Sequence, residues 1–278
     1  MAADDLSGLR QRLLLAVTLA REAGELTLRY FQDADLAVIT KADATPVTAA
    51  DRGAEELIRA GLARALADDG VVGEEFGETP GRNAWRWWLD PIDGTQSFVR
   101  GVPLYGTMIG LEHDGAAVAG VVFFPALAEL YFAGRGLGSW WVPRLPALAT
   151  APGQPAAPRR AQVSSVDTLA AARFNTTSAK GWESERMGGV YRRLLDRTAT
   201  DRTWGDCYGH VLVATGRADV MIDPVMHDWD CAPLQTIVEE AGGRFTDLAG
   251  NATIHGKSAV STNGVLHDAV LELVGRRG

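Results

Sequence analysis

Residues 88–98 (WLDPIDGTQSF) constrain the fold of this chain most strongly. An apolar, aromatic run ends there at two carboxylates, Asp90 and Asp93, which a glycine and two hydroxyl residues follow. Pro91 has a fixed φ and no N–H, so regular strand pairing should end at this point. We therefore predict a buried strand that ends in a carboxylate cluster and continues into the start of a helix.

This turn allows two interpretations. Two carboxylates close together repel each other, and a cation between them removes that penalty. Gly94 lets the backbone approach a ligand, and the hydroxyls of Thr95 and Ser97 lie near a helix N-terminus, where N–H groups favour phosphate. An Asp-Pro turn followed by a helix that Asp93 or Thr95 caps explains the same residues. The stretch alone leaves both interpretations open.

Further carboxylates stand where other elements begin or end. Asp51 lies three residues after Thr48 at the start of a predicted helix. It either complements the helix dipole in a capping box or orients a water. Glu74 and Glu75 follow a short predicted strand at 70–72. Because adjacent strand residues point to opposite sides, one of them can join the central pair, while a surface loop is the alternative.

Three acidic residues occur in the second half of the chain where predicted strands meet helices. Asp230 directly precedes an apolar helical face, and a helix N-cap explains it equally well. Asp206 and Asp223 are equally consistent with a cap and a turn residue. These positions alone therefore assign no function.

The order of predicted elements divides the chain near residue 145. In the first part, an amphipathic helix at 6–31 and a helix from Thr48 accompany strands at 104–112, 117–124 and 129–133. Strands without intervening helices indicate an antiparallel sheet. The second part alternates strands and helices, as a smaller α/β unit does. We predict its elements as strand 171–175, helix 184–197, strand 200–204, helix 207–216, strand 218–222, helix 230–241, strand 243–247, strand 257–261 and helix 264–275.

We expect two subdomains, 1–145 with the metal site and 146–278 closing the substrate site. A Pro- and Ala-rich segment at 143–160 connects them. The net charge of −8 offers no basic footprint for nucleic acid. No apolar run approaches the ~18 residues of a membrane span, and the start lacks a signal-peptide pattern. The two cysteines have no CxxC partner, so we expect no disulfide framework and a cytoplasmic location.

Four motifs together resemble the inositol monophosphatase-like superfamily of Mg²⁺-dependent phosphatases, over nearly the whole chain. They are Gly73-Glu74-Glu75, Asp90-Pro91-Ile92-Asp93-Gly94-Thr95, Trp229-Asp230 before a small residue, and Val47-Thr48-x-x-Asp51. The resemblance implies the α/β (α+β) class, with a layered αβαβα sandwich. It also implies a homodimer that acts on a small phosphate monoester.

The same resemblance implies roles for individual residues. The implied metal ligands, for two or three Mg²⁺ ions per site, are Glu74, Asp90, the carbonyl of Ile92, Asp93 and Asp230. Backbone N–H groups of Gly94 and Thr95 are implied to bind phosphate. Thr95 and Asp51 are implied to orient the attacking water, with Glu75 in support. Oxygen-only ligands suit Mg²⁺, and phosphoryl transfer depends mainly on positioning and charge neutralisation.

The substrate has to be inferred from other stretches. Residues 204–209 (WGDCYG) and 100–103 (RGVP) resemble the histidinol-phosphate phosphatase branch of the family, whose enzymes serve histidine biosynthesis. Histidinol phosphate carries an ammonium group and an imidazole, which carboxylates and a stacking ring would hold. Asp206 and Asp223, beside Gly205, are the candidate carboxylates.

Three alternatives to histidinol phosphate hydrolysis remain. Inositol 1-phosphate offers only neutral hydroxyls, for which one such acid suffices, and other small phosphate esters form a third substrate class. A non-catalytic metal-binding regulatory protein is the alternative outside enzymes. Because every implied acidic ligand is present together with Thr95 and Asp51, the motifs favour an active enzyme.

Overall fold

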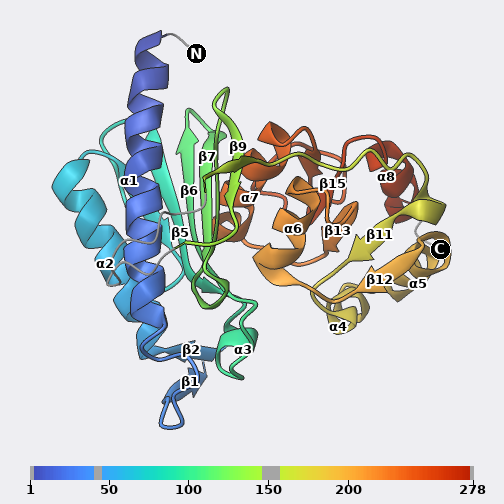
Figure 1. Ribbon diagram of the computed structural model, residues 1–278, viewed down its shortest axis with the longest axis horizontal. Coiled ribbons are helices and arrows are strands. Elements are labelled where there is room, and N and C mark those ends of the chain that lie inside the picture. Colours follow the sequence, from blue (N-terminus) through green and yellow to red (C-terminus); the bar gives the residue numbers. More distant parts are fainter. Residues whose placement is uncertain (1–2, 41–45, 146–156, 276–278) are drawn as a thin grey trace.

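The computed structural model describes residues 3–40, 46–145 and 157–275 of the 278-residue chain. Five layers follow one another across the molecule (Figure 1). Two helices cover one face of an eight-stranded sheet, two helices lie between this sheet and a five-stranded sheet, and three helices cover the far side. The predicted αβαβα sandwich is therefore confirmed.

The large sheet has the strand order β10-β9-β8-β7-β6-β5-β3-β4. Its strands are β3 (Gly70–Gly73), β4 (Gly77–Thr79), β5 (Trp85–Asp93), β6 (Gly106–His113), β7 (Ala116–Phe124), β8 (Glu129–Gly134), β9 (Gly138–Val142) and β10 (Arg159–Arg160). A separate antiparallel pair is formed by β1 (Val38–Thr40) and β2 (Pro46–Thr48).

One pair of strands departs from the antiparallel sheet that we expected. β3 and β5 run parallel, with Gly73 opposite Leu89, while the other described neighbours in this sheet pair antiparallel. The connection between these strands carries β4 and an irregular stretch, which is enough chain to return to the starting end. Parallel strands end at the same edge, so Glu74 emerges beside the carboxylates at the end of β5.

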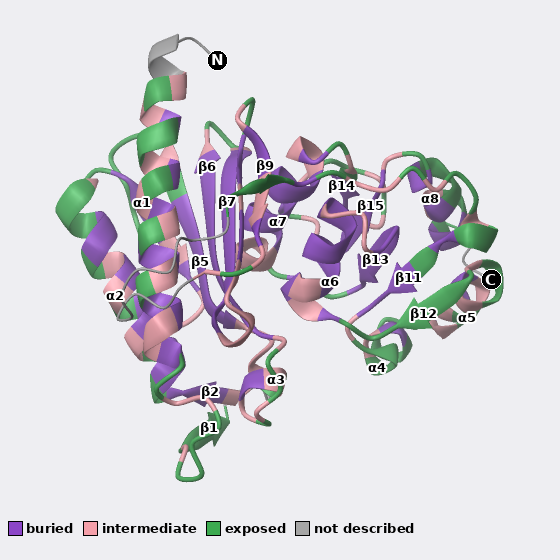
Figure 2. Ribbon diagram, viewed as in Figure 1, coloured by how far each residue is buried: buried purple, intermediate pink, exposed green. Residues whose placement is uncertain are grey.

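The two faces of the large sheet are both buried. Helices α1 (Ala3–Thr27) and α2 (Ala49–Ala65) pack on one face, where they contact Trp87 and Leu89 of β5. Trp88 of the same strand belongs to the core on the other face. Figure 2 shows the resulting concentration of buried residues in the strands and in the helix between the sheets. Burial on both faces explains why Trp87, Trp88 and Leu89 follow one another in β5 without a polar residue between them.

Helix α7 (Asp228–Glu240) lies between the two sheets, beside α6 (Asp206–Ala214). Two glycines of the large sheet allow its close approach. A Cβ atom at Gly110 would lie 2.6 Å from Cβ of Ala232, and one at Gly120 would lie 2.0 Å from the carbonyl oxygen of Pro233. Any larger residue at these positions would push α7, and its first-turn acidic residues, away from the sheet.

The five-stranded sheet has the order β12-β11-β13-β15-β14. Its strands are β11 (Arg173–Asn175), β12 (Thr200–Arg202), β13 (Val220–Asp223), β14 (Arg244–Thr246) and β15 (Ala259–Thr262), and its outer helices are α4 (Ala179–Ser184), α5 (Gly188–Arg197) and α8 (His267–Gly275). The helix predicted at 184–197 is confirmed as α5 from Gly188 to Arg197, but its predicted start is four residues too early. The chain breaks between α4 and α5 because Arg186 adopts a left-handed φ of 58°.

The boundary predicted near residue 145 stays a prediction. Residues 146–156 of the predicted connection at 143–160 lie outside the described residues. Just beyond them, β10 pairs with β9, so the large sheet includes residues from both sides of this boundary. Among the described residues, no helix is long and apolar enough to cross a membrane.

Candidate active site

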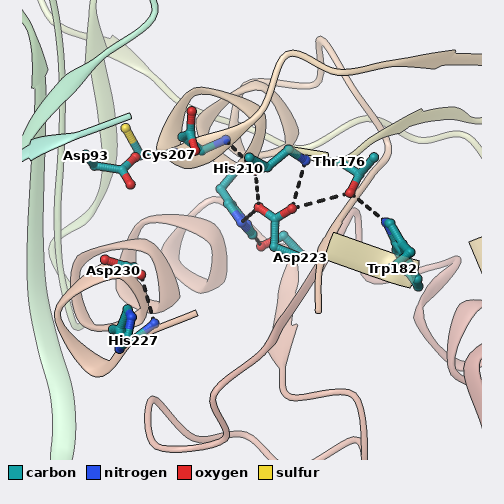
Figure 3. Close-up of polar contacts among 11 residues, drawn as sticks. Asp93, Thr176, Trp182, Cys207, His210, Asp223, His227 and Asp230 are labelled. Carbon is teal, nitrogen blue, oxygen red and sulfur yellow. Dashed lines mark hydrogen bonds and ion pairs between the residues drawn. The ribbon is translucent and has the colours of Figure 1, made fainter. Parts of the chain in front are cut away.

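Three carboxylates converge where the large sheet meets α7. Ligand oxygens of Asp90, Asp93 and Asp230 all lie within 4.8 Å of one another. They open onto a cavity of about 380 Å³. Figure 3 shows the side chains of Asp93 and Asp230 facing each other. The cavity is lined by Pro46, Glu74, Asp90, Ile92, Asp93, Gly94, Thr95, Gln96, Asp206, Val225, His227, Trp229 and Asp230.

A backbone N–H group orients each of the three carboxylates. Asp90 Oδ1 accepts a hydrogen bond from the N–H of Ile92 at 3.0 Å. Asp93 Oδ2 accepts one from the N–H of Cys207 at 2.6 Å, and Asp230 Oδ2 accepts one from the N–H of His227 at 2.8 Å. The last bond belongs to a capping box at the start of α7. The N-cap interpretation and the ligand interpretation of Asp230 are therefore compatible.

Burial and mutual repulsion disfavour ionisation of this cluster. Burial raises the pKa of Asp90 well above its usual value, and the charges of Glu74, Asp93 and Asp230 raise it further. Burial and the Asp230 charge raise the pKa of Asp93 to about 7. Burial likewise raises the pKa of Asp230 to about 7, with Glu74 adding to the effect. A divalent cation among these oxygens would offset the repulsion, and oxygen ligands alone suit Mg²⁺.

The turn after β5 brings Gly94 and Thr95 to the cavity. Gly94 has a φ of 80° and is the N-cap of α3 (Thr95–Phe98), so the expected cap by Asp93 or Thr95 is wrong. A Cβ atom at Gly94 would lie 3.0 Å from the carbonyl oxygen of Leu104. The Thr95 hydroxyl donates a hydrogen bond to the carbonyl oxygen of Ile92 at 3.0 Å. Thr95 is thereby fixed next to the carbonyl predicted as a metal ligand.

Asp51 forms the capping box predicted at the start of α2. Its Oδ2 accepts hydrogen bonds from the N–H and the hydroxyl of Thr48, both at 2.7 Å. Burial raises the pKa of Asp51, and the Glu74 charge also raises it. Asp51 is buried and is not among the residues that line the cavity. The capping box is therefore confirmed, and the role of Asp51 in orienting a water stays a prediction.

The two glutamates after β3 differ in their surroundings. Glu74 lines the cavity, and its N–H donates to the carbonyl oxygen of Leu89 at 3.1 Å, which ties the turn to β5. Glu75 is not among the lining residues, and its N–H donates to Glu55 Oε2 at 2.8 Å. Glu55 is a buried residue of α2 that the sequence analysis did not single out. The Asp51-x-x-x-Glu55 spacing on one helical face was the available signal.

Of the predicted substrate residues, Asp206 lines the cavity and the other two do not. Burial raises the pKa of Asp206 well above its usual value, with the charges of Asp93 and Asp223 adding to it. A Cβ atom at Gly205 would lie 2.3 Å from Cα of Thr177, so Gly205 serves close packing. A cationic group is the partner that would favour an ionised Asp206.

Asp223 faces the interior instead of the cavity. Its oxygens accept hydrogen bonds from the N–H of Thr177 at 2.8 Å and from the Thr177 hydroxyl at 2.7 Å. His210 Nε2 lies 3.5 Å from Asp223 Oδ2. The Thr177 hydroxyl in turn accepts the N–H of Asp206 at 2.7 Å. This geometry supports an indirect role for Asp223: it fixes Thr177, and Thr177 in turn fixes Asp206.

Two aromatic side chains of the cavity were missed by the sequence analysis. His227 and Trp229 both line it, and their rings stack with centroids 4.8 Å apart and planes 16° apart. Trp229 immediately precedes Asp230 in the Trp-Asp motif, and His227 lies two residues before Trp229, so the motif was the available signal. The pair provides a flat surface next to the carboxylates.

Comparison with known proteins agrees with this geometry. Residues 9–277 match the Inositol monophosphatase family. This chain belongs to that family. A histidinol-phosphatase from Chlorobaculum parvum is 45% identical over 95% of this chain and 96% of its own length. One from Mycobacterium tuberculosis is 44% identical over 93% and 96%, and an inositol-1-monophosphatase from Mesorhizobium japonicum is 30% identical over 94% and 95%.

Solved structures of the inositol monophosphatase family share the fold. The extragenic suppressor protein suhB from Bartonella henselae superposes with a TM-score of 0.84 at 27% identity, covering 96% of this chain and all of its own. The Thermotoga maritima inositol monophosphatase superposes with a TM-score of 0.81 at 28% identity, covering 95% and 97%. The resemblance stated from the four motifs is thus confirmed at the level of family and fold.

Proposed function

We propose that this protein is a Mg²⁺-dependent phosphatase that hydrolyses L-histidinol phosphate to L-histidinol and phosphate. The observation that carries the proposal is the cluster of one buried and two half-buried carboxylates, which opens onto one cavity with Asp206 and a stacked aromatic pair. Relatives named histidinol-phosphatase, 40–45% identical over at least 93% of this chain, support the choice of substrate.

The residues that would hold two or three Mg²⁺ ions are Glu74, Asp90, the carbonyl of Ile92, Asp93 and Asp230. All of them line the cavity and all offer oxygen, so the donor set fits this hard cation. When bound, Mg²⁺ supplies positive charge that offsets charge on the phosphate and lowers the pKa of a water.

The remaining chemistry is a matter of positioning by residues of the chain. The N–H groups of Gly94 and Thr95 would hold the phosphate. Asp51, together with the Thr95 hydroxyl, would orient the attacking water. Burial raises the pKa of Asp51, which makes its carboxylate a stronger base than an exposed aspartate. Glu75 supports the site through the turn that it shares with Glu74.

The histidinol end of the substrate would lie against Asp206, His227 and Trp229. An ammonium group next to Asp206 would offset the repulsion that raises the pKa of this carboxyl. The stacked rings of His227 and Trp229 match the flat imidazole of histidinol. An inositol ring offers neither a cation nor a flat face.

We also propose that the enzyme is a cytoplasmic homodimer. The molecule that it binds is the small-molecule substrate. Light scattering that gives twice the 29.7 kDa mass of one chain would support the dimer. A mass of one chain at all concentrations would contradict it.

Inositol 1-phosphate is the second candidate substrate, because relatives about 30% identical carry the name inositol-1-monophosphatase.

Phosphate release with Mg²⁺, measured as kcat/KM for histidinol phosphate and inositol 1-phosphate side by side, tests the proposed substrate. We expect a preference for histidinol phosphate of at least about 100-fold, or roughly 2.7 kcal/mol of transition-state discrimination. The opposite preference would assign the enzyme to inositol phosphates. Metal binding without release from either ester would revive the non-catalytic alternative.

A further inference from the structure

Glu55 is a buried carboxylate, and substrate binding does not explain its position. It lies on α2 with its side chain fully buried, and Arg59 one turn later contacts it at 2.7 Å between Nε and Oε1. A desolvated ion pair of this kind often adds little to stability, because the cost of removing both charges from water offsets their attraction. Another function of the pair has to be sought in its other contacts.

Both oxygens of Glu55 bind the backbone of the turn after β3. Oε2 accepts the N–H of Glu75 at 2.8 Å, and Oε1 accepts the N–H of Phe76 at 3.3 Å. Arg59 extends the grip, since it donates to the carbonyl oxygen of Gly77 and, at 3.1 Å, to the hydroxyl of Thr79. Hydrogen bonds from backbone N–H groups to a carboxylate are short and strong, so they fix the path of the chain.

The end of β3 is shaped to admit this carboxylate. A Cβ atom at Gly73 would lie 2.0 Å from Glu55 Oε1 and 2.4 Å from its Cδ. No side chain larger than hydrogen fits there while Glu55 keeps its position. Gly73 directly precedes Glu74, which lines the metal cavity. The strand end and the helix are therefore fitted together around one charged group.

We propose that Glu55 is a positioning residue that aims Glu74 at the Mg²⁺ site. Helix α2 would then carry two carboxylates on one face, four residues apart, with different tasks. Asp51 belongs to the water-orienting part of the site, and Glu55 holds the turn that delivers Glu74 next to it. The inference rests on the metal site of the proposed function but not on the identity of the substrate.

Asp69 provides a matched control at the opposite end of β3. It too is buried and paired with an arginine, because Arg12 Nε and Nη2 each contact its oxygens at 3.0 Å. Trp87 Nε1 also donates to it at 3.0 Å. It precedes the four-residue β3, which spans about 13 Å, and it does not line the cavity. Its loss should cost stability without redirecting Glu74.

The test compares Glu55→Gln with Asp69→Asn by calorimetric titration of Mg²⁺ into substrate-free protein, alongside each Tm. Glu55→Gln keeps the shape but presents an amide to N–H donors. We expect it to raise the Mg²⁺ Kd at least about tenfold, the lower end of the effect of groups that orient metal ligands. Asp69→Asn should lower the Tm while its Kd stays within about twofold of wild type.

Two results would overturn the inference: a Kd within twofold of wild type in Glu55→Gln, or an equal rise in Asp69→Asn. Should Glu55→Gln not fold, Gly73→Ala answers the same question, since its methyl group displaces the Glu55 carboxylate. A tenfold weaker Kd in Gly73→Ala supports the inference, and an unchanged Kd overturns it. If wild-type protein binds no Mg²⁺, the proposed metal site falls as well; if wild type binds and the variants bind equally, only the role of Glu55 falls.

Discussion

At the scale of single residues, backbone N–H groups from separate segments fix the acidic side chains of the cavity. Asp93 on β5 is held by Cys207 of α6, and Asp230 is held by His227. A carboxylate oriented in this way loses little side-chain conformational entropy when a cation binds. Without a cation the same residues repel one another, and such repulsion is typical of a binding site and not of a structural core.

Asp206 provides the residue-scale prediction on specificity. Asp206→Asn should raise the KM for histidinol phosphate about tenfold or more, the usual value of a charged hydrogen bond, and leave the KM for a neutral phosphate ester within about threefold. Asparagine is the suitable replacement because residue 206 has a φ of 53°, which asparagine adopts at a lower cost than alanine. Steady-state kinetics on both esters check this. Equal changes in both KM values would place Asp206 outside the substrate contact.

Sequence motifs predicted most of the candidate site. Asp90 and Asp93 lie at the end of β5 and Asp230 lies in the first turn of α7, and these motifs with fixed spacing predicted that the three carboxylates converge. Contacts between distant segments carry no such signal. Neither the partnership of Asp223 with Thr177 nor the fit of Glu55 against Gly73 follows from spacing along the chain.

At the scale of elements, two features deliver the acidic residues to one place. Parallel pairing of β3 and β5 brings their following turns to the same edge of the large sheet. Glycines in β6 and β7 let α7 approach closely enough for its first turn to reach that edge. The existence of these elements was predictable from hydrophobic periodicity. The parallel pairing was not, because periodicity indicates a strand without indicating its direction or partner.

Helix ends were less predictable than helix cores. The predicted helix at 6–31 ends at Thr27, and the predicted helix at 184–197 is interrupted at Arg186. An arginine in left-handed conformation leaves no compositional signal, because arginine otherwise favours helices. Local propensity therefore located these helices but not their limits.

The contact between β14, β15 and α8 leads to a prediction on pH. His267 at the start of α8 is buried and bonded to the Thr262 hydroxyl at 2.9 Å and the Thr246 hydroxyl at 3.0 Å. Burial, together with the Arg244 charge, lowers its pKa from 6.5 to about 4. The folded state thus keeps this ring neutral, and its contribution is present above pH 6.5 and lost as the pH falls towards 4.

The Tm of wild-type protein should therefore fall more steeply between pH 7.5 and pH 5 than the Tm of His267→Gln. The variant should have the lower Tm at pH 7.5, because it loses the fit between the two threonines. Thermal unfolding in matched buffers with EDTA measures both, and EDTA removes any effect of metal binding. Parallel curves for the two proteins would contradict the neutral state of His267.

At the scale of the whole molecule, the layered fold places the cavity between its two halves. The proposed metal ligands come from the large sheet and from α7, whereas Asp206 comes from α6 and is anchored through Thr177 to the smaller sheet. Both halves would therefore contribute to the phosphate chemistry, the first through the large sheet and the second through α7, and α6 would add recognition of the rest of the substrate.

The central claim is that the carboxylate cluster is a catalytic magnesium site. The most direct test measures the Tm and the phosphate release of wild type and of Asp93→Asn, each with EDTA and with Mg²⁺. In EDTA, the variant should be at least as stable as wild type, because it removes repulsion from the cluster. With Mg²⁺, the Tm of wild type should rise by ligand linkage while that of the variant does not. Its turnover should fall by more than about 100-fold, beyond the loss typical of residues that only support metal ligands. A variant that keeps both its turnover and its Mg²⁺-dependent rise in Tm would contradict the account.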